Sequence, residues 1–432
     1  MRTVVHSTIV VALLLGCGGR VDEEAPGRPS DTGPAAIPPT PVPAPLAPKC
    51  EQVDLVAGRA TLRVQGNAGD RPRLGPSVML PDGGFVQLFY LGASLWQLYL
   101  PAGHDLGAPL PPAVRVAARA TGVMTASMTA QANGRLTLVY AAGVEGPRIV
   151  RELAPGKASA SDDPEGSAPL AGLSGSAWPA QLTWNGELGF ASFNGLEGTV
   201  GFIRDGRYAS DTVLRDLYWN KIPYAGHPTA AGDGFVFMYD AVGPTPIGTS
   251  YVWTGAYELS SDGKISAAHD LGFPPLWAQK HPFVAWLTHP EGGATLVVRQ
   301  IPDQAAGSGS LLALDVSPAF TLGPASVLAS DLSRAAVPVN AARIGGTPVA
   351  VFGTRDPSDA NHARGWSVAF GGAKPAVREL PVAAPRYPLD RETTSDLESR
   401  VAGNERGGYL TFSESDGTLV VLRAACTQAP TR

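Results

Sequence analysis

The sequence predicts an all-β chain built from a repeated unit, on three observations. Apolar residues make up 44% of the 432 residues and charged residues only 16%, while Gly and Pro are abundant at 51 and 40. This balance favours turn-rich β structure over a helical bundle. No long segment after the N-terminus has the 3.6-residue apolar period of a helix. Short apolar runs that follow glycine-containing turns recur along the chain instead, and they define the repeat.

The clearest copy of the unit spans residues 76–100. Its order is an apolar segment, the turn Pro81–Gly84, the run Phe85–Leu91, a break, and a further run from Leu95 to Leu100, which predicts three consecutive strands. A glycine placed before such a run serves as the anchor of each copy. Seven anchors follow one another at intervals of 48 to 62 residues: Gly84, Gly134, Gly186, Gly234, Gly293, Gly346 and Gly408.

The interval suits one four-stranded antiparallel sheet per repeat, which needs about 40 to 50 residues. Five of the units have a proline at the expected start of the first strand, a position where proline is tolerated. These prolines are Pro76, Pro179, Pro228, Pro282 and Pro338.

Residues 1–17 have the features of an export signal. Arg2 precedes an apolar run from Ile9 to Leu15 that is too short to span a bilayer, and Leu14-Leu15-Gly16-Cys17 follows. The segment resembles a bacterial lipoprotein signal peptide with its lipobox, which implies that Cys17 is lipidated and becomes the mature N-terminus. Gly18 stands where an aspartate would retain a lipoprotein in the inner membrane, so the resemblance implies an outer-membrane location in the cell envelope. The alternative is an ordinary cleaved signal with a coincidental cysteine.

Residues 18–49 hold nine prolines and almost no large apolar residue. Such a segment forms no packed element and takes extended polyproline conformation at about 3.1 Å per residue. We therefore expect a signal peptide at 1–17, a Pro-rich disordered linker at 18–49, a folded domain at 50–426 and a tail at 427–432.

The two other cysteines, Cys50 and Cys426, stand at the two ends of the repeat region. An exported protein meets an oxidising compartment, so we expect a disulfide between them. Repeats that close into a ring must also bring the chain ends together, as this bond requires. Two unrelated free thiols are the alternative.

Residues 50–426 are therefore predicted to form a seven-bladed β-propeller closed by the disulfide, with six or eight blades as alternatives. The last blade, Val401–Arg423, would take its outer strand from residues 52–58 or 60–64. The chain resembles the broad propeller class in period and strand pattern alone. It carries no WD dipeptides in register, no kelch signature in every blade and no sialidase Asp-box, so no specific family is named.

In a propeller, the loops that lead into the innermost strands surround one mouth of the central channel. Aromatic rings with ammonium and imidazole groups in those loops would suit a sugar or a peptide. The candidate ligand-binding residues are Trp178, Trp219, Lys221, Tyr224, His227, Trp277, Lys280 and His281. The competing and favoured interpretation is that the aromatics fill blade junctions and the histidines are ordinary loop residues, because a fold alone does not license a function.

A second candidate is the loop 386–400, whose carboxylates could perform acid/base hydrolysis or hold Ca²⁺. A solvated charged loop is the favoured interpretation, because no spacing fixes a pair. The charged residues are Asp390, Arg391, Glu392, Asp396, Glu398 and Arg400. The segment Asp356–Asn361 lacks the glycine and glutamate of a calcium motif.

No phosphate-binding, nucleophile-elbow or zinc motif is present, so no cofactor and no metal are expected. The net charge of −5 and the absence of a basic stripe argue against nucleic acid as a partner. We expect a lipoprotein, anchored in the lipid membrane by acylated Cys17, that presents a non-enzymatic binding face for protein or glycan. The alternative is a carbohydrate-active hydrolase or lyase, with His227, His281 and Tyr224 as the first suspects.

Overall fold

Antiparallel strands are the regular elements of the computed structural model, and no helix occurs among the residues it describes. The described residues are 52–64, 72–118, 126–141, 148–158, 178–185, 188–194, 199–204, 207–210, 223–231, 233–244, 250–260, 264–271, 283–289, 292–300, 309–332, 340–355, 363–371, 374–381, 399–414 and 417–427. All of them belong to one unit, Ala47–Arg432. The prediction of an all-β chain is confirmed. The signal peptide, Cys17, the linker and Cys50 lie outside the described residues.

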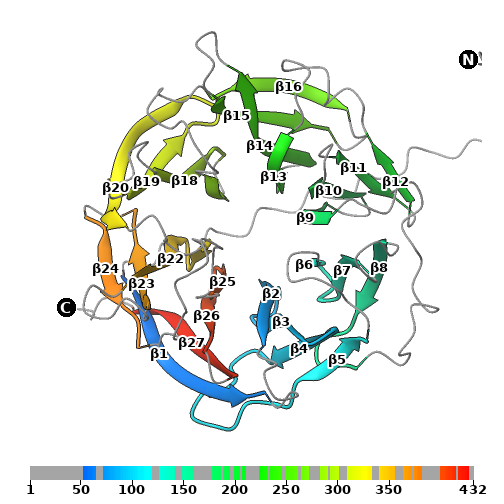
Figure 1. Ribbon diagram of the computed structural model, residues 1–432, viewed down its shortest axis with the longest axis vertical. Helices are drawn as coiled ribbons and strands as arrows, with labels where there is room; N and C mark the ends of the chain where they lie inside the picture. Colours follow the sequence, from blue (N-terminus) through cyan, green and yellow to red (C-terminus); the bar gives the residue numbers. More distant parts are fainter. Residues whose placement is uncertain are drawn as a thin grey trace, which may run out of the picture. The chain divides into compact units, whose positions relative to one another are not determined.

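The strands form sheets that radiate from a common centre (Figure 1). From the innermost to the outermost strand, the four-stranded sheets are β2 (Arg73–Met79), β3 (Phe85–Leu91), β4 (Ser94–Leu100), β5 (Val114–Ala117); β9 (Trp178–Asn185), β10 (Leu188–Asn194), β11 (Thr199–Arg204), β12 (Arg207–Ser210); β13 (Pro223–Ala231), β14 (Gly234–Pro244), β15 (Ser250–Leu259), β16 (Ile265–Asp270); β17 (Phe283–Thr288), β18 (Ala294–Gln300), β19 (Gly309–Val316), β20 (Leu322–Leu332); β21 (Asn340–Ile344), β22 (Thr347–Arg355), β23 (Ala363–Ala369), β24 (Ala376–Glu379); and β25 (Ser399–Asn404), β26 (Gly407–Ser413), β27 (Thr418–Thr427), β1 (Gln52–Arg63). A further sheet has three described strands, β6 (Ser127–Ala130), β7 (Leu136–Ala141) and β8 (Arg148–Leu153).

The innermost strands contact one another in a closed circuit. In order, β2 contacts β6, β6 contacts β9, β9 contacts β13, β13 contacts β17, β17 contacts β21, β21 contacts β25, and β25 contacts β2. This arrangement is a β-propeller, as predicted. Its described part has six four-stranded blades and the three-stranded sheet β6–β7–β8, where seven blades were expected, with six or eight as alternatives.

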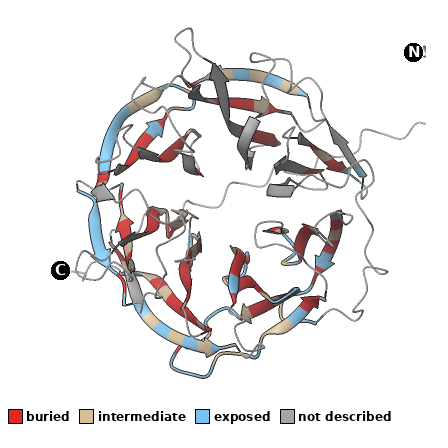
Figure 2. Ribbon diagram, in the orientation of Figure 1, coloured by how far each residue is buried: buried red, intermediate tan, exposed pale blue. Residues whose placement is uncertain are grey.

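Each glycine-anchored run of the sequence repeat proves to be the second strand of its sheet. The runs correspond to β3, β7, β10, β14, β18, β22 and β26. A second strand is covered on both faces by the adjacent sheets, so its residues are apolar without alternation. Every residue of β26 is buried, whereas every residue of the outermost strand β24 is exposed. Figure 2 shows the same gradient from the centre to the rim.

The hydrophobic core is divided into layers between adjoining sheets. Leu88 and Leu138 belong to one cluster that joins β3 to β7. Phe89 and Val421 belong to another, which joins the first sheet to the last. Each layer therefore holds two sheets together, and the set of layers holds the ring together.

The ring is closed by pairing of the two ends of the described chain. Strand β1 pairs with β27 from Gln52 opposite Thr427 to Arg63 opposite Thr418, with an irregularity between Asp54 and Gly58. The expected outer strand of the last blade is thus confirmed, and residues 52–58 and 60–63 both belong to it. Cys426 is disulfide-bonded. Its partner lies outside the described residues, so the bond to Cys50 stays a prediction.

The prolines of the repeat are not at strand starts where they are described. Pro76, Pro179 and Pro228 lie within β2, β9 and β13. Each of these innermost strands pairs on one side only. Proline is acceptable there because the missing N–H costs no ladder hydrogen bond at an unpaired edge.

Candidate functional site

The structure describes the backbone of only some of the residues that were predicted to surround the channel mouth. Trp178 begins β9, while Tyr224 and His227 lie inside β13, the neighbouring innermost strand. His227 is therefore a strand residue opposite Met238, and not the loop residue that was expected. The side chains of these three residues lie outside the description. Trp219, Lys221, Trp277, Lys280 and His281 lie outside the described residues altogether.

The charged loop 386–400 is described only at its end. Arg400 lies inside β25 and not in a loop. Its guanidinium donates to the backbone carbonyl oxygens of Gly75 and Leu74 in β2, both at 3.0 Å. This arginine therefore joins two innermost strands, which is a structural role and not the acid/base or calcium-binding role considered for the loop. The carboxylates of that loop and the segment 356–361 lie outside the described residues.

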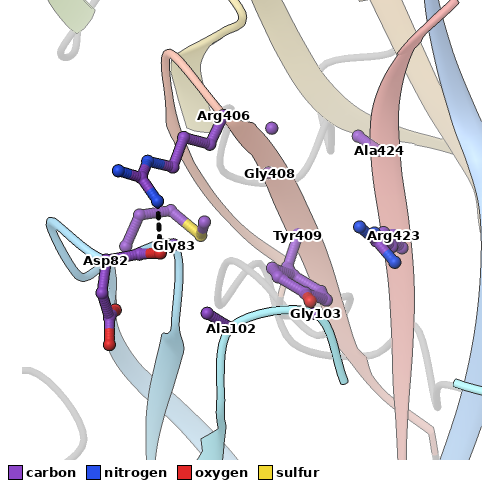
Figure 3. Close-up of a pocket in the computed structure, with 11 residues that line it drawn as sticks. Asp82, Gly83, Ala102, Gly103, Arg406, Gly408, Tyr409, Arg423 and Ala424 are labelled. Carbon is purple, nitrogen blue, oxygen red and sulfur yellow. Dashed lines mark hydrogen bonds between the residues drawn. The ribbon is translucent and has the colours of Figure 1, made fainter. Parts of the chain in front are cut away.

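A pocket of about 210 Å³ lies at the junction of the first and last sheets, and we call it the seam pocket. Its wall is formed by the β2–β3 turn, the β4–β5 loop, the β25–β26 turn and strands β26 and β27 (Figure 3). The polar side chains that line it are those of Asp82, Arg406, Tyr409 and Arg423. Much of the remaining wall is glycine and alanine.

Tyr409 is held rigidly at the base of the seam pocket. Its ring stacks on Phe85 with 4.7 Å between ring centroids, and only 3% of the residue is exposed. Burial raises the pKa of Tyr409 above its ordinary value of 10.0, and the nearby positive charge of Arg423 opposes that effect. The hydroxyl therefore stays protonated at neutral pH and acts as a hydrogen-bond donor rather than as a base.

The other two charges of the seam pocket face different groups. Asp82 accepts a hydrogen bond from the backbone N–H of Gly84 at 2.8 Å. The pKa of Tyr99 is raised, first by the burial of its ring and then by the negative charge of the Asp82 carboxylate. Arg406 donates through a guanidinium nitrogen to the carbonyl oxygen of Asp82 at 2.9 Å, which fixes it across the two turns (Figure 3).

The seam pocket and the predicted mouth lie at opposite ends of the innermost strands. The predicted mouth is formed by loops that lead into these strands. The seam pocket is formed by the turns that leave them, β2–β3 and β25–β26. The sequence predicts a turn at Pro81–Gly84, but no local signal could show that Asp82 and Arg406 meet, since 324 positions separate them.

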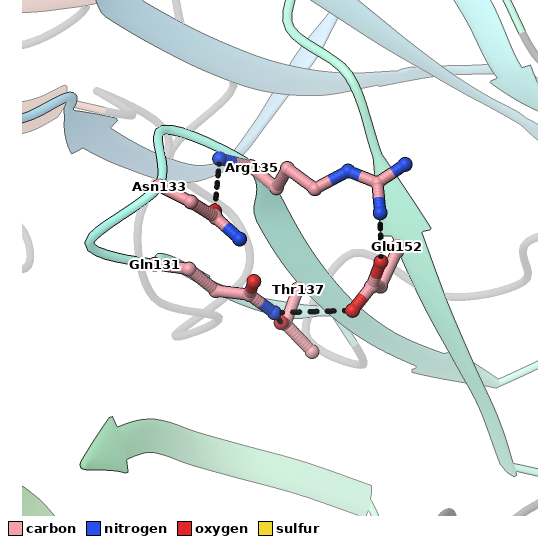
Figure 4. A network of polar contacts seen from close by, with 5 residues as sticks. All are labelled: Gln131, Asn133, Arg135, Thr137 and Glu152. Atoms are coloured by element: carbon pink, nitrogen blue, oxygen red, sulfur yellow. Dashed lines mark hydrogen bonds and ion pairs between the residues drawn. The ribbon is translucent and has the colours of Figure 1, made fainter. Parts of the chain in front are cut away.

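A polar network stands at the β6–β7 turn (Figure 4). Gln131 donates to Thr137 at 2.7 Å, and Arg135 forms an exposed ion pair with Glu152 at 2.7 Å. Exposed pairs of this kind contribute about 0 to 1 kcal/mol. The network therefore braces a turn and does not form a reaction centre.

The same arrangement recurs in the sheet β17–β20. There His289 is 2.8 Å from the hydroxyl of Thr295, which donates to Asp315 at 3.1 Å. Thr295 pairs with Asp315 across the strands as Thr137 pairs with Glu152. A threonine of the second strand thus lies opposite an acidic residue of the third strand in both sheets, which indicates a structural role within the repeat unit.

The described part of the chain contains no group of three or more His, Cys, Asp or Glu placed to hold a metal ion. Within the same residues, no helix is long and apolar enough to cross a membrane.

Comparison with known proteins extends the description of the fold. No protein-family model matches the chain, and no curated protein matches it. Among solved structures, a polysaccharide lyase of family PL25, an ulvan lyase, matches with a TM-score of 0.53 and 10% identity, covering 85% of this chain and 98% of that chain. The ulvan lyase bound to -[GlcA(1-4)Rha3S]- matches with a TM-score of 0.52 and 10% identity over 85% and 98% of the two chains. At this identity the likeness is one of fold.

Proposed function

We propose that this propeller is a carbohydrate-active enzyme, a lyase or a hydrolase that cleaves a polysaccharide outside the cytoplasm. The observation that supports it most is the likeness of fold to two structures of a PL25 ulvan lyase, which extends over 85% of this chain and 98% of the lyase chain. Because one fold hosts many functions, the chemistry must come from residues of this chain.

The candidate residues for a lyase are Tyr224, His227 and His281. A lyase removes the proton from the carbon beside a sugar carboxylate and breaks the bond to the glycosidic oxygen, which leaves a carbon–carbon double bond and a protonated leaving group. Imidazole and phenol groups serve as base and acid in such proton transfers. Lys221 and Lys280 would stabilise the negative charge that develops on the substrate. A hydrolase would instead use two carboxylates, for which the loop 386–400 supplies Asp390 and Glu392.

The test is incubation of the purified domain with a panel of acidic and neutral polysaccharides. A lyase yields products with the ultraviolet absorbance of an unsaturated sugar, and a hydrolase yields new reducing ends without it. Under this proposal, His227→Ala and His281→Ala lower kcat by about 10²- to 10⁴-fold. Arg378→Gln, on the exposed strand β24, is the control and leaves kcat unchanged. Intact polysaccharide after incubation with the whole panel would overturn the enzymatic proposal.

The second candidate is a non-enzymatic face that binds protein or glycan. The observation in its favour is the seam pocket, where Arg406, Arg423 and the stacked Tyr409 offer hydrogen-bond donors to a ligand. Retention of intact polysaccharide or of a protein partner by the immobilised domain, with no cleavage, would support this candidate over the first.

The expected envelope location belongs to the same proposal. Acylation of Cys17 would anchor the chain, since each buried CH₂ of an acyl chain contributes about 0.8 kcal/mol, and residues 18–49 would act as the tether. Mass spectrometry of the mature protein tests this. An unmodified Cys17 would contradict the anchor and the outer-membrane location.

We also count the sheet β6–β7–β8 as a blade, which makes the propeller seven-bladed. The support is the position of β6 between β2 and β9 in the circuit of innermost strands. Likewise we assign Cys50 as the disulfide partner of Cys426, because the β1–β27 ladder, which ends at Gln52 opposite Thr427, brings the two ends of the repeat region together. Digestion without reductant should release the two cysteines in one linked peptide.

A further inference from the structure

We propose that the seam pocket binds the oxyanion group, carboxylate or sulfate, of an acidic saccharide, with Arg423, Arg406 and the hydroxyl of Tyr409 as its ligands. The saccharide class rests on the proposed function. The oxyanion site rests on the geometry of the seam pocket itself.

Arg423 is the main argument for an anionic ligand. It lines the seam pocket, is partly buried on β27, and has no hydrogen bond or ion pair to any of the described residues. A partly buried cation has lost part of its hydration, and an anion bound beside it compensates for that loss. Arginine also matches the planar or branched oxygens of carboxylate and sulfate, because its N–H groups form a fixed fork.

Tyr409 supplies an uncharged donor beside this cation. The residue is only 3% exposed, yet its hydroxyl makes no hydrogen bond within the described part of the chain. The hydroxyl is open to the seam pocket, where a ligand or water can accept its hydrogen bond. Stacking on Phe85 holds the ring in place, and a ligand would find this donor already positioned.

The one carboxylate in the wall does not oppose an anion. Asp82 is held by the N–H of Gly84 at 2.8 Å, and Figure 3 shows its carboxylate turned away from Arg423. Arg406, by contrast, stays at the rim through its hydrogen bond to the Asp82 carbonyl. The lining thus carries two positive charges and one negative charge that faces elsewhere.

The glycines of the wall allow close approach of a ligand. Gly103 has a φ of +74°, and a Cβ built there would meet nothing within 4 Å. A Cβ at Gly83, whose φ is +96°, would come within 3.3 Å of the Arg406 side chain, so glycine at this position makes room for Arg406 at the rim. The volume of about 210 Å³ is below the range of about 300 to 1,000 Å³ that encloses drug-sized ligands. It suits one charged group of a sugar, with the rest of the chain outside.

The test is calorimetric titration of the full folded domain with three matched oligosaccharides: one carrying carboxylates, one carrying sulfates and one neutral. We expect binding of one or both acidic ligands, and the comparison of the two identifies the oxyanion. Arg423→Gln should weaken that binding about tenfold, as expected for loss of a hydrogen-bonded charge. Arg423→Lys should retain part of the affinity, and Arg378→Gln should leave it unchanged.

Tyr409→Phe gives a second measurement if Arg423→Gln fails to fold, since it keeps the ring that stacks on Phe85. Equal affinity for neutral and acidic ligands, or unchanged affinity in both Arg423→Gln and Tyr409→Phe, would overturn the site. Binding that depends on Arg423 without cleavage of any polysaccharide would keep the site and reject the enzymatic proposal. Cleavage with a KM that Arg423→Gln does not change would keep the enzymatic proposal and reject the oxyanion site.

Discussion

Arg400 of β25 donates a hydrogen bond through Nε to the backbone carbonyl oxygen of Gly75 in β2 at 3.0 Å. A second nitrogen donates to Leu74, so one side chain joins the last blade to the first. The two residues are 325 positions apart in the sequence. The same seam carries the β1–β27 ladder, the Phe85–Tyr409 stack and the seam pocket. Closure of the ring and formation of the pocket are therefore one structural event.

Arg400→Met should destabilise the ring at this seam. The substitution keeps an aliphatic side chain but leaves the carbonyl oxygens of Gly75 and Leu74 without their charged donor. We expect a loss of about 1.5 to 3 kcal/mol in the free energy of unfolding, measured by denaturant titration. Arg378→Met on the exposed strand β24 is the matched control. Equal stability of the two variants would show that the seam does not depend on Arg400.

The disulfide prediction can be tested by a pair of single substitutions. If Cys50 and Cys426 are partners, Cys50→Ser and Cys426→Ser should each cost about 2 to 5 kcal/mol, and the double variant should cost no more than either. Thermal unfolding with and without reductant gives the values. Additive losses would mean that Cys426 is bonded to another cysteine.

Two glycines with almost the same backbone angle should respond differently to alanine. Gly134 has a φ of +79° and Gly293 a φ of +78°. A Cβ at Gly134 would meet nothing within 4 Å, whereas one at Gly293 would collide with the backbone of Val316 and Ser317. Gly134→Ala should therefore cost only the strain of the left-handed conformation, about 1 to 2 kcal/mol, and Gly293→Ala distinctly more. Equal losses in denaturant unfolding would contradict this account.

A pair of substitutions to alanine compares the contribution of the core layers to stability with that of the outermost strands. Leu410 of β26 is fully buried between the last two sheets, and Val377 of β24 is 45% exposed. Leu410→Ala should cost about 2 to 5 kcal/mol because it leaves a cavity. Val377→Ala should stay within about 0.5 kcal/mol. A rim substitution as costly as the core one would mean that the outer strands carry more of the stability than their burial indicates.

The sequence predicted the parts of the fold that are buried on both faces. The run Phe85–Tyr90 was identified as a strand because all its members except Gln87 are apolar or aromatic, and this is a consequence of its place between two sheets. Outer strands such as β24 carry no such signal, since all of its residues are exposed. The repeat was therefore recognised from its second strands, while the fourth strands were inferred only from the length of the interval.

The candidate site was predictable to a smaller extent. The residues of the expected mouth were chosen from loops that lead into innermost strands, but Tyr224 and His227 lie inside β13, because that strand begins earlier than its proline suggested. The seam pocket could not be predicted, since Tyr409 and Arg423 look like ordinary strand residues until the last sheet closes on the first. Such a site depends on contacts between the ends of the chain, which local patterns do not encode.

The last prediction concerns alkaline pH. The pKa of Tyr409 is raised in the folded state by burial, so the unfolded chain releases this proton first, near the ordinary value of 10.0. The stabilisation is complete below that pH and is lost as pH rises toward the folded-state pKa, because the unfolded state then binds fewer protons. Tyr409→Phe should remove this part of the alkaline destabilisation, so the stability curves of variant and wild type should converge above pH 10. Tyr99→Phe should act in the same direction, because burial and the carboxylate of Asp82 raise the pKa of Tyr99 as well. Arg378→Gln on the exposed strand β24 is the control and should keep the pH dependence of the wild type. If the free energy of unfolding of Tyr409→Phe falls as steeply above pH 10 as that of the wild type, the Tyr409 hydroxyl does not contribute to the alkaline destabilisation.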